Sequence, residues 1–207
     1  SNDLKECKKR YKQLLADGSA ESARMLRELE DKEMALNDRV RRVAELEGML
    51  KSREEAIDAI RRKVTDALTG FEGKGLSISI RNGNVYVSMD DKLLFRSGSF
   101  EIDPNGARAV RDLAEVLAQN ADINVMVEGH TDQLKDTLDL SAKRATTVVR
   151  LLLENKGIDP NRIIAAGRGE SLPVDPAKTS EARAKNRRTE IILTPKLDEL
   201  MQLMEKQ

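Results

Sequence analysis

Residues 77–87 read SISIRNGNVYV, a stretch in which apolar and polar side chains alternate on both sides of an Asn-Gly pair. Alternation with a period of two is typical of a half-buried β-strand, and Asn-Gly is a preferred pair for a tight hairpin turn. The stretch therefore predicts a β-hairpin. Just before it, Gly70, Gly73 and Gly75 follow a long run without proline. We expect a helix to end near residue 70 and a sheet to begin after it.

The sequence after the hairpin alternates between helix and strand patterns. Asp103-Pro104 predicts a helix start with an Asp cap, and Ser141 can cap a second helix that closes at Gly157. Strands are expected at residues 123–127, 162–166 and 189–193, and residues 93–95 extend or follow the second hairpin strand. The pattern predicts an α+β fold over residues 71–207, with helices packed on a mixed β-sheet.

Residues 1–70 predict one long helix. Its apolar positions recur every seven residues, the spacing of a coiled-coil seam, and only Ser22 breaks the register. The register consists of Leu15, Leu29, Leu36, Val43, Leu50, Ile57 and Val64. Glutamates intrude at the second seam position, so two interpretations stand. The helix is a coiled-coil spacer that could form a homodimer, or an amphipathic helix that packs on a neighbour.

The composition excludes several classes of protein. The chain has 36 basic and 36 acidic residues, so no global charge favours nucleic acid. No run approaches 18 apolar residues, so we expect no membrane span, and membrane association would need an anchor outside these residues. The single cysteine, Cys7, excludes an intramolecular disulfide and is either an inert thiol or an intermolecular link.

Five short motifs follow one another in residues 76–195. They are Phe95 with Gly98-Ser99 and Pro104, Gly129-His130-Thr131-Asp132, Leu140-Ser141 with Arg144-Ala145, Gly167-Arg168-Gly169-Glu170 with Pro173, and Asn186-Arg187-Arg188 with Glu190. In this order they resemble the OmpA-like C-terminal domain shared by outer-membrane protein A, peptidoglycan-associated lipoprotein and the flagellar stator protein MotB. The resemblance implies an OmpA-like βαβαβ sandwich. It also implies non-covalent binding of peptidoglycan, which would anchor an envelope protein or the outer membrane to the wall from the periplasm.

The resemblance implies that Asp132 and Arg144 grip the diaminopimelate of the peptidoglycan stem peptide. The residue types agree, because diaminopimelate offers an ammonium and a carboxylate, and an arginine fork suits a carboxylate. We expect Arg144 in the first turn of its helix, where free N–H groups add attraction for an anion. On residue types alone, the two could equally pair with each other. We expect a site open to water, so that alanine at either position leaves the fold intact.

Other residues enter the expected site less directly. Thr131 could support Asp132 by a hydrogen bond, and the resemblance also places Leu140 and Arg187 at the ligand. The stretch 133–139 is shorter than the family's usual loop, and Thr137 stands where the family commonly has Asn, so contacts from this loop are not carried over. Arg183, Arg187 and Arg188 could form a surface patch or support the fold near the groove.

The sequence predicts no catalysis, metal or cofactor. His130 is the only histidine, so no other histidine supports a zinc site or a Ser-His-Asp triad, and nothing resembles a nucleophile elbow. Two further functions stay open besides wall anchoring. A MotB-like stator subunit would require a membrane segment, and an intracellular coiled-coil adaptor would bind protein instead of glycan.

Overall fold

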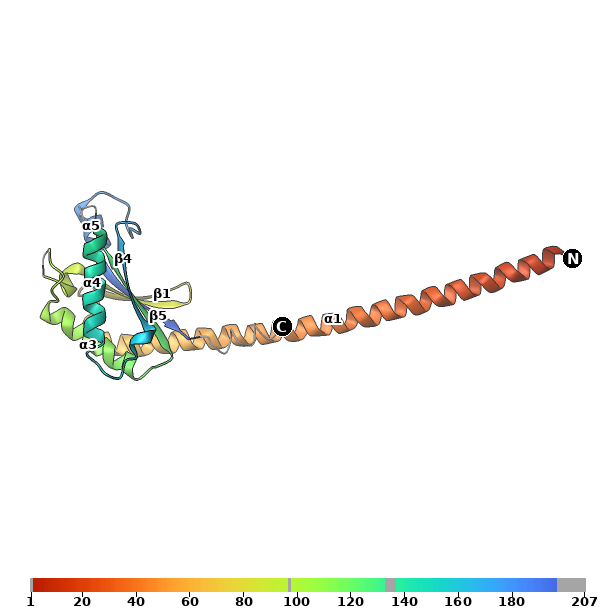
Figure 1. Cartoon of the computed structure of the whole chain (residues 1–207), viewed down its shortest axis with the longest axis horizontal. Coiled ribbons are helices and arrows are strands. Elements are labelled where there is room, and N and C mark those ends of the chain that lie inside the picture. The colour runs from red at the N-terminus through yellow and green to blue at the C-terminus, as the bar shows by residue number, and fades with distance from the viewer. Residues whose placement is uncertain (1, 97, 133–136, 197–207) are drawn as a thin grey trace. The chain divides into compact units, whose positions relative to one another are not determined.

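The computed structural model describes residues 2–96, 98–132 and 137–196. It divides into two compact units, Ser1–Lys51 and Ser52–Gln207. The described residues of the first unit, 2–51, belong to the helix α1, which runs from Asn2 to Leu68 (Figure 1). The second unit contains the end of α1 and the sheet. The glycines predict a domain boundary at residue 70, and it stays a prediction that residues 71–207 fold independently of the helix before them.

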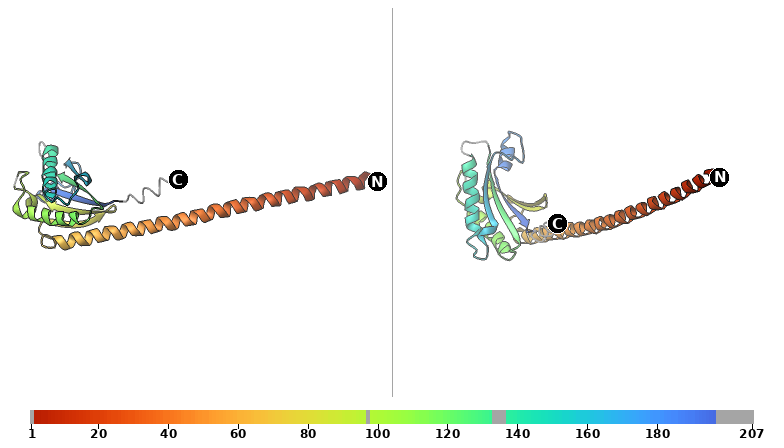
Figure 2. Two further views of the ribbon diagram at one scale, coloured as in Figure 1. Left: turned by 60° about the horizontal axis from the view of Figure 1, so that its bottom comes forward. Right: turned by 45° about the vertical axis from the view of Figure 1, so that its right-hand side comes forward.

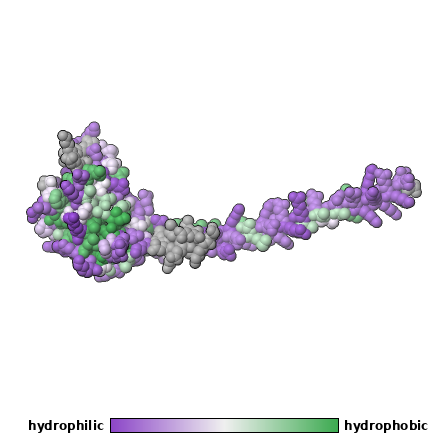
Figure 3. Space-filling model, in the orientation of Figure 1, coloured by the Kyte–Doolittle hydropathy of each residue, from purple (hydrophilic) through white to green (hydrophobic). Residues whose placement is uncertain are grey.

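The helix of the first unit exposes both its charges and its apolar side chains. Figure 3 shows a mainly hydrophilic helix surface with short hydrophobic patches at intervals. The five seam residues of this unit are 54 to 62% exposed: Leu15, Leu29, Leu36, Val43 and Leu50. In the part of the chain that the structure describes, no helix combines the length and the apolar character that a bilayer span requires.

We propose that this exposed seam pairs two chains. At high concentration we expect light scattering to report a dimer, and Leu36→Glu to shift it toward monomer by placing a charge in the seam. Met34→Glu is the matched control, because Met34 is 62% exposed and Leu36 60%, and Met34 lies off the seven-residue register. A wild-type chain that stays monomeric at millimolar concentration would show that α1 is only a spacer.

The second unit is built on a five-stranded mixed sheet with strand order β1-β2-β5-β3-β4, so β1 and β4 are its edge strands. Its strands are β1 Leu76–Arg81, β2 Asn84–Asp90, β3 Ile123–His130, β4 Ile163–Gly169 and β5 Arg188–Pro195. The β3–β4 pair is parallel, and the other pairs are antiparallel. The remaining helices are α2 Asp91–Leu94, α3 Pro104–Ala118, α4 Thr137–Leu152, the 3-10 turn η1 Pro160–Arg162 and α5 Ser180–Asn186.

The hydrophobic core lies between one face of this sheet and the helices α3 and α4 (Figures 1 and 2). Alternate strand residues such as Val87, Val127 and Ile191 point into it and are fully buried. The last turns of α1 join the same core through Ile57, Ile60, Val64 and Leu68. The end of the seven-residue register therefore packs within the chain, as the amphipathic-helix interpretation expects, and only the first unit keeps a free seam.

Several expectations are confirmed by local geometry. Asn82 and Gly83 have φ angles of 50° and 72°, which is the left-handed pair that a type I′ hairpin turn requires. The Asp103 side chain accepts a hydrogen bond from Asn105 N, with Pro104 at the first helical position. Residues 93–95 follow β2 instead of extending it, and they lie in or just after the short helix α2. One expectation was wrong, because α4 begins at Thr137 instead of being capped by Ser141.

Candidate functional site

Asp132 lies just after β3 and is held in an ion pair. Its Oδ2 accepts a hydrogen bond from Arg187 Nη1 at 2.6 Å, and the Asp132 side chain is only 8% exposed. Arg187 follows α5 and immediately precedes β5, which pairs with β3, so the sheet itself brings the two residues together. The sequence resemblance placed both at the ligand, and the structure joins them directly.

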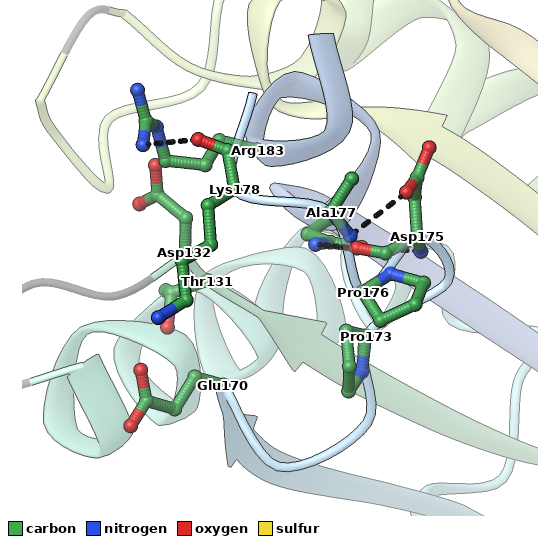
Figure 4. A pocket seen from close by; sticks show the side chains of 10 residues that line it. Thr131, Asp132, Glu170, Pro173, Asp175, Pro176, Ala177, Lys178 and Arg183 are labelled. Atoms are coloured by element: carbon green, nitrogen blue, oxygen red, sulfur yellow. Dashed lines mark hydrogen bonds between the residues drawn. The ribbon is translucent and has the colours of Figure 1, made fainter. Parts of the chain in front are cut away.

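A small cavity of about 120 Å³ opens beside Asp132 (Figure 4). Thr131, Asp132 and Glu170 lie on one side of it, and Pro173, Asp175 and Pro176 lie opposite. Two basic residues, Lys178 and Arg183, also line the cavity. The Arg183 guanidinium donates a hydrogen bond to the Lys178 carbonyl oxygen at 3.0 Å. The cavity therefore has both acidic and basic side chains in its lining, and it suits a small polar ligand.

Arg144 is buried in α4 and held by three groups from one segment of chain. Its Nη1 lies 2.8 Å from Asp91 Oδ1, and its Nε donates to the Ser99 carbonyl oxygen at 3.0 Å. Its guanidinium carbon lies 5.0 Å from the ring centre of Phe95. The Arg144 side chain is 4% exposed. In this conformation the Arg144 guanidinium is occupied by contacts within the protein.

These contacts correct three expectations. Asp132 and Arg144 do not pair with each other, because each has a different counterion, Arg187 and Asp91. Both side chains are buried, so the expectation of a site open to water was wrong. Arg144 is also well inside α4, which begins at Thr137, so it receives no help from the N-terminal N–H groups of the helix. The sequence analysis missed the earlier helix start, although Asp136, a residue type that commonly caps helices, stands directly before Thr137 in the sequence.

Asp91 is the site residue that the sequence analysis missed. Burial raises the pKa of its carboxyl, against the opposing effects of Arg144 and Arg187, and Asp132 raises that pKa further. The backbone N–H of Asp91 donates to the Arg187 carbonyl oxygen at 3.1 Å, and both residues line one cavity of about 150 Å³. Asp91, Asp132, Arg144 and Arg187 therefore form one electrostatic cluster, which we call the four-charge cluster.

The other residues expected at the site differ in burial and in the contacts that they make. Thr131 is buried and its N–H donates to the Gly169 carbonyl oxygen at 2.9 Å, while Leu140 is half-buried on α4. Arg188 is buried beside Glu190, and Arg183 is exposed, so the three arginines do not form one surface patch. The expected loop 133–139 lies partly outside the described residues, which resume at Thr137.

Two motif glycines fix the distance between α4 and the sheet. A Cβ on Gly129 would overlap the Ser141 carbonyl oxygen, and one on Gly167 would lie 2.8 Å from the Ala142 nitrogen. The Ser141 hydroxyl adds a bond across the same contact, because it accepts from Gly169 N at 3.0 Å. The backbone of α4 thus touches β3 and β4, and this contact places Arg144 close to the end of β3.

Known proteins share this architecture. A model of the OmpA family matches residues 94–187. Outer membrane protein A of Bordetella avium is 34% identical over 137 residues, which cover 59% of this chain and 68% of that protein. Motility protein B of Bacillus subtilis (strain 168) is 30% identical over 128 residues, which cover 58% of this chain and 49% of the relative. This chain therefore spans about half the length of that relative.

Solved structures agree with the sequence comparison. The structure of the cell wall anchor of the T6SS from Pseudomonas aeruginosa matches with a TM-score of 0.58 and 26% identity, over 65% of this chain and 99% of that one. The five-stranded mixed sheet with its helices is the fold of OmpA-like and MotB-like domains. The chain belongs to the OmpA family.

Proposed function

We propose that this chain binds cell-wall peptidoglycan without catalysis and anchors an envelope protein to the wall. The observation that carries the proposal is the four-charge cluster, in which an acid and an arginine from the OmpA family's ligand motifs are each held by a replaceable counterion. The likeness to a cell wall anchor supports the same role. Binding from the periplasm, in association with the outer membrane, is part of the proposal.

The ligand would enter by an exchange of ion-pair partners. The ammonium of diaminopimelate takes the place of Arg187 on Asp132, and its carboxylate takes the place of Asp91 on Arg144. The released Asp91 and Arg187 already line one cavity, so they can pair with each other. No charge is then left buried without a partner, which is the condition for an ionic site to bind at all.

This exchange predicts weak binding at each site. The ligand makes two charge-assisted contacts, while the protein exchanges two internal ion pairs for the one between Asp91 and Arg187, so the gain per contact stays below the roughly 1.5 to 3 kcal/mol of an unopposed one. Association costs several kcal/mol more. Retention on intact wall would come from many stem peptides and many copies, with avidity on the order of a hundredfold or more.

The test is sedimentation of the purified chain with peptidoglycan sacculi, with free diaminopimelate-containing stem peptide as competitor. We expect the chain to sediment with the wall and to be released by millimolar stem peptide. Stem peptide in which lysine replaces diaminopimelate lacks the second carboxylate and should release far less. Equal release by both peptides would contradict the partner exchange, and no sedimentation would contradict wall binding.

The exchange makes Asp91 a competitor of the ligand for Arg144. The released Arg187 is 30% exposed and water can hydrate it without Asp91, so Asp91→Asn should tighten stem-peptide binding several-fold. The same change should affect stability with a defined pH dependence. Burial raises the pKa of Asp91 above 3.8, so the folded state holds that proton more tightly than the unfolded state. Wild type therefore loses stability relative to the variant as the pH rises from about 4 toward neutrality.

Urea denaturation of both proteins at several pH values, with calorimetric titration of stem peptide, measures both effects. Asp90→Asn is the control for stem-peptide binding alone, because Asp90 lies next to Asp91 but Arg144 pairs with Asp91. Burial raises the pKa of Asp90 as well, so that variant should show a stability change with pH in the same direction and no change in binding. If the stability difference moves in favour of wild type as the pH rises, Asp91 supports Arg144 and does not compete for it.

A stator-like subunit is the second candidate function, favoured by the 30% identity to Motility protein B. Both functions use the same wall site and differ in what the chain is attached to. Fractionation of the native full-length protein separates them, because a stator subunit stays with the inner membrane and an outer-membrane anchor does not.

A further inference from the structure

A second charged cluster lies on the sheet face away from α3 and α4. Glu128 of β3 stands opposite Glu190 of β5 in the sheet register, and His130 follows on β3. The three side chains are 5, 6 and 2% exposed, in that order. Two like charges in directly opposed positions destabilise a strand pair, so other groups must hold them there.

Arginines occupy one oxygen of each carboxylate. Glu128 Oε1 accepts from Arg168 at 2.5 and 2.8 Å, and Glu190 Oε1 accepts from Arg81 at 2.6 Å and faces Arg188 at 3.1 Å. Burial acts to raise the pKa of Glu190, but the contacts from His130, Arg81 and Arg188 outweigh it and hold that pKa well below its usual range. Glu190 is thus a carboxylate at neutral pH.

The second oxygen of each carboxylate is turned toward the imidazole. His130 Nε2 lies 3.7 Å from Glu128 Oε2 and 3.5 Å from Glu190 Oε2. These distances exceed those of ordinary hydrogen bonds. Among the described residues, neither ring nitrogen of His130 has a hydrogen-bond partner. The imidazole thus lies within ion-pair distance of both carboxylates but makes a well-formed hydrogen bond to neither, and a ligand placed between the three atoms would contact all of them.

We propose that Glu128, His130 and Glu190 bind a divalent transition-metal ion, with zinc preferred. One imidazole nitrogen and two carboxylate oxygens lie within 4.8 Å of one another. Zinc binds such donors at about 2.0 to 2.2 Å, which puts neighbouring ligands about 3.3 to 3.6 Å apart in a tetrahedron. The two Nε2 to Oε2 distances are close to that spacing. The fourth position would hold water from a cavity of about 480 Å³ that the three residues line.

The arginines determine how tightly such an ion binds. Carboxylate ligands are normally hydrogen-bonded by outer groups, and Arg188, 6% exposed, can serve in this way. Arg81 and Arg168 are each 44% exposed and can move outward. Because three guanidiniums outnumber the two carboxylates, the local field opposes a cation, and we expect zinc to bind less tightly than it would without these arginines. Removing one exposed arginine should therefore strengthen zinc binding.

The experiment is calorimetric titration of zinc chloride into the chelator-treated chain carrying Cys7→Ser, which removes the exposed thiol. We expect one zinc per chain, at least tenfold weaker binding in Glu190→Gln, and several-fold tighter binding in Arg168→Gln. A merely structural network gives no reason for the arginine variant to bind zinc more tightly. Unchanged or weaker zinc binding in Arg168→Gln would overturn the proposal.

A second measurement needs no variant that alters the buried cluster. His130 is the only histidine, so its imidazole resonances in a proton–nitrogen NMR spectrum require no assignment. We expect stoichiometric zinc to shift the Nε2 signal while Nδ1 keeps its proton. Zinc that binds without moving these signals sits elsewhere on the chain, and that result would also overturn the site.

Discussion

Arg144→Ala is expected to abolish retention on sacculi, and it should also destabilise the fold. The substitution removes the cation that meets the ligand carboxylate. An unopposed contact of this kind is worth about 1.5 to 3 kcal/mol, and because Asp91 competes for Arg144, the loss per site is at most roughly 10- to 150-fold. It also leaves Asp91, 17% exposed, without its nearest counterion. Breaking one partner of a buried pair costs about 3 to 5 kcal/mol, so the melting temperature should fall as well.

The two effects can be separated by milder substitutions at the same site. Arg144→Lys keeps the charge beside Asp91 but lacks the fork, so it should melt closer to wild type and still bind poorly. Asp132→Asn removes the anion while keeping the shape of the side chain, and it should lose binding to a similar degree. Lys143→Ala is the matched control, because it removes an exposed cation next to Arg144. Arg144→Lys and Asp132→Asn proteins that both fold and sediment like wild type would show that the clamp is wrong.

Gly129→Ala should cost more stability than any other single methyl group added to the sheet. The new Cβ would overlap the Ser141 carbonyl oxygen, and a helix backbone cannot turn aside as a side chain can. Overpacking typically costs about 1 to 3 kcal/mol, and we expect a value at or above the upper end here. Because α4 must move, Arg144 moves with it, and wall binding should fall together with stability.

Urea denaturation of Gly129→Ala beside Gly70→Ala measures this effect. A Cβ on Gly70 meets nothing within 4 Å, and Gly70 has no positive φ, so its substitution should be nearly neutral. Equal urea midpoints for Gly129→Ala and Gly70→Ala would mean that α4 can move away from the sheet at Ser141 at little cost. In that case, close backbone contact would not be what positions Arg144.

The sequence predicted the elements that depend on local chemistry. The Asn82-Gly83 turn and the Asp103 cap each follow from two or three neighbouring residues, and both are as expected. The start of α4 was missed because Ser141, farther along the chain, offered a competing cap to Asp136. The family motifs located Asp132 and Arg144, but not the counterion Asp91, which lies in a short helix without a periodic pattern.

The position of β4 at the edge of the sheet has a practical consequence for solution work. Its neighbour on one side is β3, and in the described part of the chain no strand pairs with it on the other. Its Ile164 side chain is 61% exposed. A free strand edge with an exposed apolar residue favours edge-to-edge pairing of sheets in concentrated samples. Light scattering on residues 52–196, which lack the exposed α1 seam, would separate this association from pairing through α1. Association that persists in this fragment and falls with Ile164→Lys would come from the β4 edge.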